Sequence, residues 1–188
     1  MQRKAKTLLC VAVAGLAFAG ALRAAETEVD SNTFGGLEAR SIGPAVMGGR
    51  IAAIDAVPQY PLTIYVGAAG GGVWRSTDGG VAWKPVFDDN VQSIGAIAID
   101  PKNPKTVWVG TGESWTRNST SVGDGLYKTT DGGDSWQRVG LENSERIARV
   151  QVSPADGNTV WVCATGHLWD SHPDRGVFKT TDGGKTWK

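Results

Sequence analysis

An eight-residue stretch occurs three times in the chain at nearly constant spacing. It reads STDGGVAW at 76–83, TTDGGDSW at 129–136 and TTDGGKTW at 180–187. The three aspartates, Asp78, Asp131 and Asp182, are therefore 53 and then 51 residues apart. A fixed period of this size is typical of proteins built from stacked structural repeats. This spacing constrains the fold more than any other feature of the sequence.

Each copy of the stretch lies between two short apolar runs. This is the pattern of a hairpin, in which an Asp-Gly-Gly turn joins two strands. The aspartate carboxylate in such a turn can accept hydrogen bonds from the backbone N–H groups that follow it, and glycine adopts the positive φ that the turn needs. We therefore interpret the aspartates as residues that hold the hairpin. A catalytic residue is rarely needed once in every repeat.

Every repeat contains short runs in which apolar residues alternate as in strands. In the second repeat these runs cover 94–100, 106–110, 125–129 and 136–139, and the other two repeats follow the same order. Four antiparallel strands with this period form one blade of a β-propeller. The sequence therefore predicts an all-β fold, a partial β-propeller of about three four-stranded antiparallel blades with the repeated turn between strands three and four of each. A β-solenoid is the alternative.

The predicted blades cover residues 50–90, 91–143 and 144–188, and the last of them is incomplete because it ends one residue after Trp187. Since propellers typically have four to eight blades, we expect the sequence to be the N-terminal part of a longer chain. Residues 26–49 form an N-terminal segment, and within it residues 38–44 take the place of a fourth strand. We expect that strand to close the ring in the complete protein.

Residues 1–25 have the pattern of a secretory signal peptide. Three basic residues, Arg3, Lys4 and Lys6, precede an apolar run at 7–22, and this order is typical of exported proteins. We therefore expect a periplasmic or extracellular protein with no membrane attachment after cleavage. Cys163 is then the only cysteine of the mature chain. An internal disulfide is excluded, and Cys163 is interpreted as a small buried side chain.

Charge and histidine content bear on the class of partner. Lysine and arginine number 19 together, as do aspartate and glutamate, and four of the basic residues lie in the signal peptide. A nucleic-acid partner needs a clustered basic surface, so we expect none. The two histidines, His167 and His172, are spaced like no strong metal-ligand template. We therefore expect neither a metal site nor a cofactor.

The antiparallel strand order predicts where a ligand would bind. The strand 2–3 loops and the loops that join blades emerge on the face opposite the Asp-Gly-Gly turns. Two of these loops, at 113–124 and 167–175, are long, polar and aromatic, and such loops on a rigid scaffold commonly bind ligands. The candidate ligand-binding residues are Glu113, Trp115, Arg117, Trp169, His172 and Arg175.

The repeated stretch resembles the Asp-box (BNR repeat), whose pattern is Ser/Thr-x-Asp-x-Gly-x-x-Trp. The matching residues are Ser76, Asp78, Gly80, Trp83, Thr129, Asp131, Gly133, Trp136, Thr180, Asp182, Gly184 and Trp187. The stretches VGTGES at 109–114, GDGLYKTTDGG at 123–133 and GHLW at 166–169 are similar to secreted bacterial sortilin-like and xyloglucanase-like proteins, often labelled glycosyl hydrolases. The resemblance covers 37–188 and implies an Asp-box propeller. It implies no single function, because the group also includes sialidases and an assembly factor.

The resemblance does not transfer a catalytic mechanism to these residues. Xyloglucanase-type enzymes have an aspartate where this sequence has Ala69. The sialidase Arg-Ile-Pro segment is matched only by Arg50-Ile51-Ala52, and Arg146-Ile147-Ala148 repeats that pattern, so Arg50 is interpreted as a repeat position. Glycoside hydrolysis needs two carboxyl groups. The catalytic candidates that remain are Glu113 and Asp170, and an ion pair of Glu113 with Arg117 or another neighbour is the structural alternative.

Two classes of function remain open from the sequence. The first is a secreted scaffold that binds a polysaccharide or a protein or peptide segment through its strand 2–3 and 4–1 loops, with the remaining blades of the longer propeller as further partners. The second is a glycoside hydrolase of xyloglucanase-like or sialidase-like type with part of its catalytic machinery in those blades. Trp108 and Trp161 occupy the same position of strand two, and we interpret them as contacts between blades.

Overall fold

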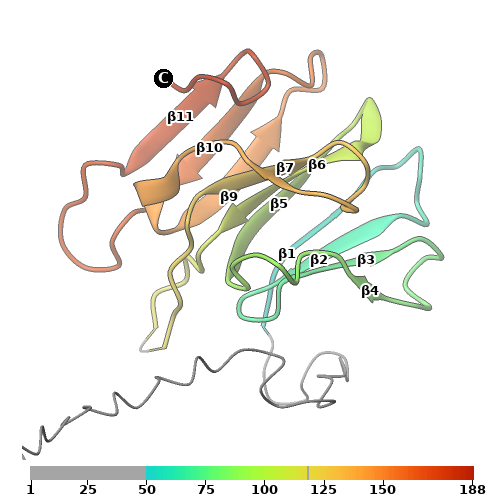
Figure 1. Ribbon diagram of the computed structural model, residues 1–188, viewed down its shortest axis with the longest axis horizontal. Helices are drawn as coiled ribbons and strands as arrows, with labels where there is room; N and C mark the ends of the chain where they lie inside the picture. Colours follow the sequence, from blue (N-terminus) through green and yellow to red (C-terminus); the bar gives the residue numbers. More distant parts are fainter. Residues whose placement is uncertain (1–49, 118) are drawn as a thin grey trace, which may run out of the picture. The chain divides into compact units, whose positions relative to one another are not determined.

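The computed structural model describes residues 50–117 and 119–188 (Figure 1). These residues form three antiparallel sheets and one short 3-10 turn, η1 (Glu142–Ser144), and they contain no α-helix. None of their elements is a helix of the length and apolar character required to cross a membrane. The predicted signal peptide and the predicted ring-closing strand lie outside the described residues, so both stay predictions.

Each sheet is formed by consecutive strands. The first contains β1 (Ile51–Ala56), β2 (Ile64–Ala68), β3 (Val73–Ser76) and β4 (Lys84–Pro85). The second contains β5 (Ile94–Asp100), β6 (Asn103–Thr111), β7 (Leu126–Thr129) and β8 (Gln137–Arg138). The third contains β9 (Ile147–Val152), β10 (Val160–Ala164) and β11 (Gly176–Thr180). All neighbouring strands pair antiparallel.

This arrangement confirms the predicted partial β-propeller, and each sheet is called a blade below. An Asp-box turn follows the third strand of every blade, after β3, β7 and β11. In blade 3 a fourth strand is only begun, because the backbone N–H and C=O groups of Lys188 exchange hydrogen bonds of 3.0 and 2.8 Å with those of Lys179.

The blades pack face to face through two apolar clusters. One cluster, between blades 1 and 2, includes Tyr65, Phe87 and Ile97. The other, between blades 2 and 3, includes Trp108 and Val150. Strand β5 is in contact with both β1 and β9, so blade 2 lies between the other two (Figure 1). Burial of these apolar faces is what holds the blades together.

Gly95 permits a close approach between the backbones of blades 2 and 3. A Cβ atom on Gly95, in β5, would lie 2.2 Å from the carbonyl oxygen of Ile147 and 2.4 Å from that of Gly112. These distances are shorter than any real Cβ contact, so a side chain at this position would force the backbones apart. Glycine at position 95 is therefore required for the packing of blade 2 against blade 3.

The Asp-box turns have nearly the same hydrogen bonds in all three blades. In blade 2, Thr129 Oγ1 donates to Asp131 Oδ1 at 2.6 Å and accepts from the Gly133 N–H at 2.9 Å. The Asp131 carboxylate also accepts the N–H groups of Asp134 and Ser135, both at 3.0 Å. These donors lower the pKa of Asp131, with the Ser135 hydroxyl as the largest cause. The Asp131 carboxylate thus accepts its hydrogen bonds from residues of its own turn, as expected for a residue that holds the hairpin.

The tryptophan that ends the box connects neighbouring blades. The indole Nε1–H of Trp136 donates to the Val86 carbonyl at 2.6 Å, and that of Trp187 donates to the Val139 carbonyl at 2.8 Å. Each acceptor belongs to the preceding blade. The Trp136 ring also packs edge-on against Phe87, with ring centroids 5.1 Å apart. The Asp-box therefore shapes its own hairpin, and its tryptophan also fixes the interface with the preceding blade.

Candidate ligand-binding site

A hollow of about 450 Å³ lies where the loops of blades 2 and 3 meet. Its walls come from the loop after β6, from the residue that precedes β9 and from the β10–β11 loop. The residues that carry polar side chains there are Ser114, Thr116, Arg146, Thr165, His167 and Arg175. Because consecutive strands are antiparallel, this site is at the end of the blades opposite the Asp-box turns. The sequence predicts a ligand-binding site at that end.

Arg146 lies at the base of the hollow and is buried. Its Nη1 donates to Glu145 Oε2 at 2.9 Å and to the Gly166 carbonyl at 3.3 Å. Its Nε is buried and has no hydrogen-bond partner among the described residues. An unpaired buried donor costs free energy, so the site holds an unused hydrogen-bonding group.

Arg175 shapes the β10–β11 loop from one end of it. Its Nε donates to the Thr165 carbonyl at 2.7 Å, and its Nη2 donates to the carbonyls of His167 and Asp170 at 2.8 and 2.9 Å. Three backbone acceptors on one guanidinium hold the loop in a fixed curve. This predicted ligand-binding residue therefore also positions its neighbours.

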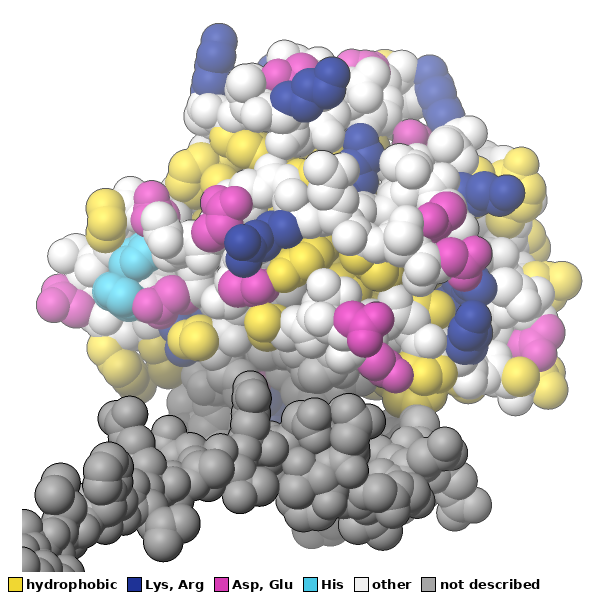
Figure 2. Space-filling view, viewed as in Figure 1, with side chains coloured by type: hydrophobic (Ala, Val, Ile, Leu, Met, Phe, Trp, Pro, Cys, Tyr) yellow, Lys and Arg dark blue, Asp and Glu magenta, His cyan; other side chains and the backbone are white. Residues whose placement is uncertain are grey.

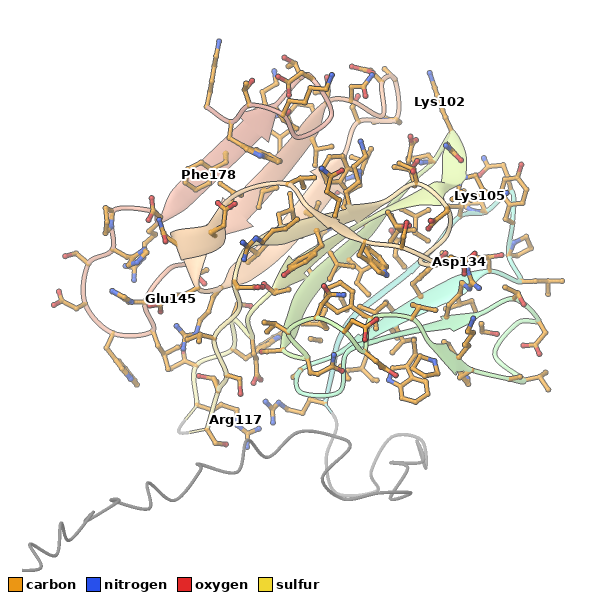
Figure 3. All side chains as sticks on the ribbon, viewed as in Figure 1. Lys102, Lys105, Arg117, Asp134, Glu145 and Phe178 are labelled. Atoms are coloured by element: carbon orange, nitrogen blue, oxygen red, sulfur yellow. The ribbon has the colours of Figure 1, made fainter. Side chains whose placement is uncertain are left out.

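Glu145 is an acidic residue in contact with Arg146 and His167, which line the hollow, and Figure 3 shows it next to the long β10–β11 loop. Its Oε1 lies 2.7 Å from His167 Nδ1. The hydrogen bond from His167 is the largest cause that lowers the pKa of Glu145. The His167 ring in turn lies edge-on to His172, with centroids 4.0 Å apart. Both histidines are visible together on one side of the surface (Figure 2).

Ligand atoms of Glu145, His167 and His172 lie within 4.8 Å of one another. These residue types bind Zn²⁺ in proteins. However, the Arg146 guanidinium occupies the second oxygen of Glu145, and its fixed positive charge opposes a cation at this point. The chemistry of the cluster therefore favours hydrogen bonding over metal binding, and the expected lack of a metal stays a prediction.

Two tryptophans project from the loops that flank the hollow. Trp115 is 70% exposed and Trp169 is 71% exposed. Trp115 lies between Ser114 and Thr116, which line the hollow, and Trp169 follows the lining residue Leu168. An exposed indole offers a flat apolar face together with an N–H donor. Both are candidates for stacking against a bound ligand.

Glu113 does not face solvent in the structure. Its side chain is only 2% exposed, and both carboxylate oxygens are bound by the Arg50 guanidinium, with Nε to Oε1 at 2.9 Å. Its backbone N–H donates to Ser93 Oγ at 3.0 Å. The ion pair considered with Arg117 therefore runs to Arg50 instead. It ties the long loop of blade 2 to the residue that precedes the first strand of blade 1.

Asp170 lies in an exposed part of the β10–β11 loop, at a positive φ of 75°. Its Oδ1 accepts the N–H of Ser171 at 2.6 Å. The structure thus brings together Arg175 and His172 from the predicted set, and adds Glu145, Arg146 and His167 to them. Glu145 and Arg146 precede a strand rather than lie in a long polar loop, so loop composition could not identify them.

Comparisons with known proteins agree with this architecture. Residues 71–188 match the family model Sortilin-Vps10, described as sortilin, neurotensin receptor 3. The xyloglucanase Xgh74A of Acetivibrio thermocellus is 27% identical over 76% of this chain and 25% of its own length. The chain therefore spans about a quarter of that curated relative.

Solved structures show the same fold. The crystal structure of an ancestral GH74 enzyme is 26% identical with a TM-score of 0.57, and the match covers 73% of this chain and 18% of that one. YCF48 from Cyanidioschyzon merolae is 19% identical with a TM-score of 0.53, and the match covers 77% of this chain and 38% of that one. The second likeness supports the fold alone.

Proposed function

For a chain that belongs to the sortilin/Vps10 family of Asp-box propellers, we propose a role as a polysaccharide-binding scaffold that acts outside the cytoplasm. The ligand occupies the hollow between the loops of blades 2 and 3. The observation that carries this proposal is the pair of exposed tryptophans, Trp115 and Trp169, each adjacent in sequence to residues that line the polar hollow. Relatedness to GH74 xyloglucanases makes a glucan-type ligand a sensible first choice.

The tryptophans suit a sugar ring because they offer a large flat apolar surface together with an N–H donor. The hollow beside these loops is lined by Ser114 and Thr116, which carry hydroxyls, and by Arg146, which carries a guanidinium. A polysaccharide presents apolar ring faces and hydroxyl edges in alternation. Few well-placed polar groups between apolar surfaces are what fix the orientation of such a ligand.

Hydrolysis is the second candidate function, and the xyloglucanase relative favours it. The surroundings of Glu113 favour binding instead, because a general acid must deliver a proton to the substrate. The Glu113 carboxylate is buried and held by Arg50. Glu113 therefore forms a structural ion pair with Arg50. A catalytic role would require Glu113→Gln to abolish the release of sugar from a xyloglucan that the chain cleaves.

The proposal is tested by isothermal titration calorimetry with two kinds of carbohydrate. One is a set of xyloglucan oligosaccharides, and the other is a set of oligogalacturonides, whose sugar rings carry carboxylates. We expect binding of at least one of them, and Trp115→Ala and Trp169→Ala should each weaken it by about tenfold or more, about 1.4 kcal/mol. The matched control is Tyr60→Ala, since Tyr60 is an exposed aromatic in the β1–β2 turn. It should leave the affinity unchanged.

Three results would count against this function. They are the absence of binding to either carbohydrate, binding that ignores both tryptophan substitutions, and binding only to an extended peptide. The last result would assign the hollow to a protein partner. A change in affinity caused by the Tyr60 variant would show that the ligand lies at the Asp-box end.

A further inference from the structure

The hollow between the loops of blades 2 and 3 is lined by basic side chains and by no carboxylate of the described residues. Its basic lining residues are Arg146, Arg175 and His167. The acidic residues of the β10–β11 loop, Asp170 and Asp174, do not line it. A negatively charged group that enters the hollow therefore meets only basic groups among the charged side chains of its walls, and this favours an anion.

The two guanidiniums are fixed on one short segment of the backbone. Arg146 Nη1 donates to the Gly166 carbonyl, and Arg175 donates to the carbonyls on either side of it, those of Thr165 and His167. Three consecutive carbonyls thus bind both guanidiniums and bring them to one place in the hollow. Arg146 precedes β9 and Arg175 precedes β11, so both belong to the loop end of blade 3.

Arg146 keeps hydrogen-bonding capacity that its neighbours do not use. Its side chain is 7% exposed, and its hydrogen bonds to Glu145 and Gly166 are both made by Nη1. Nε is buried without a partner among the described residues, whereas Nη2 also lacks a partner there but is not one of the buried unpaired atoms. Because a guanidinium carries five N–H donors in a planar fork, Nη2 remains free to bind a ligand in the hollow.

Arg175 offers a second free nitrogen in the same place. Its Nε and Nη2 make all of its hydrogen bonds among the described residues, and each of them goes to a backbone carbonyl. Its Nη1 is thus unused, and no carboxylate of the described residues neutralises its charge. Since the guanidinium is already held by the backbone, it loses little conformational freedom when a ligand binds.

Glu145 compensates only part of the positive charge around the hollow. Its Oε2 accepts from Arg146 Nη1 at 2.9 Å, and its Oε1 lies 2.7 Å from His167 Nδ1. Figure 3 labels Glu145 beside the β10–β11 loop. One carboxylate is therefore shared between a guanidinium and an imidazole, while Arg175 has only backbone acceptors. The cluster keeps a net positive charge.

We propose that the hollow contains a subsite for the anionic substituent of an acidic sugar, bound by Arg146 Nη2 and Arg175 Nη1. The inference rests on the proposed polysaccharide-binding function and specifies the class of ligand. Either a uronate carboxylate or a sulfate ester supplies the required oxygens, because a guanidinium binds both through charge-assisted hydrogen bonds. Such bonds are roughly twice as strong as those between neutral groups, so the charged sugar should bind more tightly than a neutral one.

Two pairs of ligands that differ only in charge test this subsite on the full chain. The first pair is a set of oligogalacturonides and their fully methyl-esterified forms, and the second is a set of sulfated galactan oligosaccharides and their desulfated forms. Isothermal titration calorimetry gives the affinity for each. We expect the charged member of at least one pair to bind about tenfold tighter than its neutral counterpart, and the pair that shows the difference identifies the carboxylate or the sulfate ester.

Two substitutions should change this charge preference in opposite directions. Arg146→Gln removes one guanidinium and should reduce the ratio of the two affinities by about tenfold, the effect of a hydrogen bond to a charged group. Glu145→Gln keeps an acceptor for Arg146 but removes a negative charge, so it should raise the ratio by about two- to fivefold, the size of a partly exposed charge interaction. A tighter complex cannot result from loss of folding.

Arg149→Gln is the matched control. Arg149 lies in β9, three residues after Arg146, and it is exposed and does not line the hollow. The substitution makes the same change in net charge, so it should leave the ratio of affinities unchanged. An equal loss of preference in the Arg146 and Arg149 variants would show attraction to the whole surface and would overturn the subsite.

The remaining outcomes separate the subsite from the proposed function. Equal affinity for the charged and neutral members of both pairs, with binding still dependent on Trp115 and Trp169, refutes the subsite and leaves the polysaccharide-binding role in place. A charge preference that neither Arg146→Gln nor Glu145→Gln alters also refutes the subsite. The absence of binding to every carbohydrate, or binding only to an acidic peptide, refutes both proposals.

Discussion

The ion pair between Arg50 and Glu113 provides a sharp test of how the blades are held together. The two partners differ in burial, because the Arg50 side chain is 43% exposed and the Glu113 side chain is 2% exposed. Removal of Arg50 leaves a carboxylate buried without its partner, whereas removal of the Glu113 charge leaves a guanidinium that water can reach. The two single substitutions should therefore have unequal effects on the free energy of unfolding.

The magnitudes follow from this asymmetry. Arg50→Met should cost about 3 kcal/mol, the lower end of the range for breaking a buried pair, since half-exposed Arg50 already shares its charge with water. Glu113→Gln should cost about 1 kcal/mol, because the amide keeps an acceptor for the guanidinium. The double substitution removes the isolated charge, so it should be less destabilising than the sum of the two single changes by at least about 1 kcal/mol.

Urea unfolding followed by tryptophan fluorescence measures these differences. Protein concentration must be kept low and constant, since association would add to the apparent stability. The reasoning is refuted if Arg50→Met costs no more than Glu113→Gln. It is equally refuted if the double substitution costs as much as both single changes together, because the two side chains would then act independently.

Three further predictions concern the turns, the core and the histidine cluster. The pKa of Asp131 is lowered in the folded chain. The Asp131 carboxylate therefore contributes to stability above the ordinary aspartate pKa of about 3.9, and this contribution is lost as pH falls through the lower folded value. Asp131→Asn should flatten the dependence of the urea unfolding midpoint on pH in this acid range. Ile97→Ala should lower the free energy of unfolding by about 2–5 kcal/mol, because it empties a buried position between blades 1 and 2. The control Tyr60→Ala should change it by less than about 0.5 kcal/mol. Equal urea midpoints for the two variants would contradict the packing described. Zinc chloride should not raise the melting temperature, because Arg146 opposes a cation at Glu145; an increase that His172→Ala abolishes would establish a metal site.

The sequence predicts the propeller well because its information is local. Each Asp-box fixes a turn through bonds made within about five residues, such as those of Thr129 and Asp131. Three such turns at one period determine the strand order and the length of each blade without any knowledge of distant contacts. Trp108 of strand two could be assigned to the contacts between blades for the same reason, and it is buried between blades 2 and 3. For Trp161, which is 37% exposed, the same assignment stays a prediction.

The site was less predictable because its contacts are long-range. Glu113 meets Arg50 across 63 residues, and the choice between Arg50 and Arg117 depends on how two blades stack. Arg146 repeats the Arg-Ile pattern of Arg50, so it looks like a repeat position rather than part of a site. It becomes notable only when the β10–β11 loop is seen to bury it beside Glu145.

The most direct test of the account is whether ligand binding is confined to the loop end of the blades. The indole N–H signals of a ¹⁵N-labelled sample report this during a titration with xyloglucan oligosaccharides or oligogalacturonides. The account predicts that the signals of Trp115 and Trp169 shift, whereas those of the Asp-box residues Trp83, Trp136 and Trp187 stay in place. Shifts confined to the Asp-box tryptophans, or no shift with either carbohydrate, would contradict it.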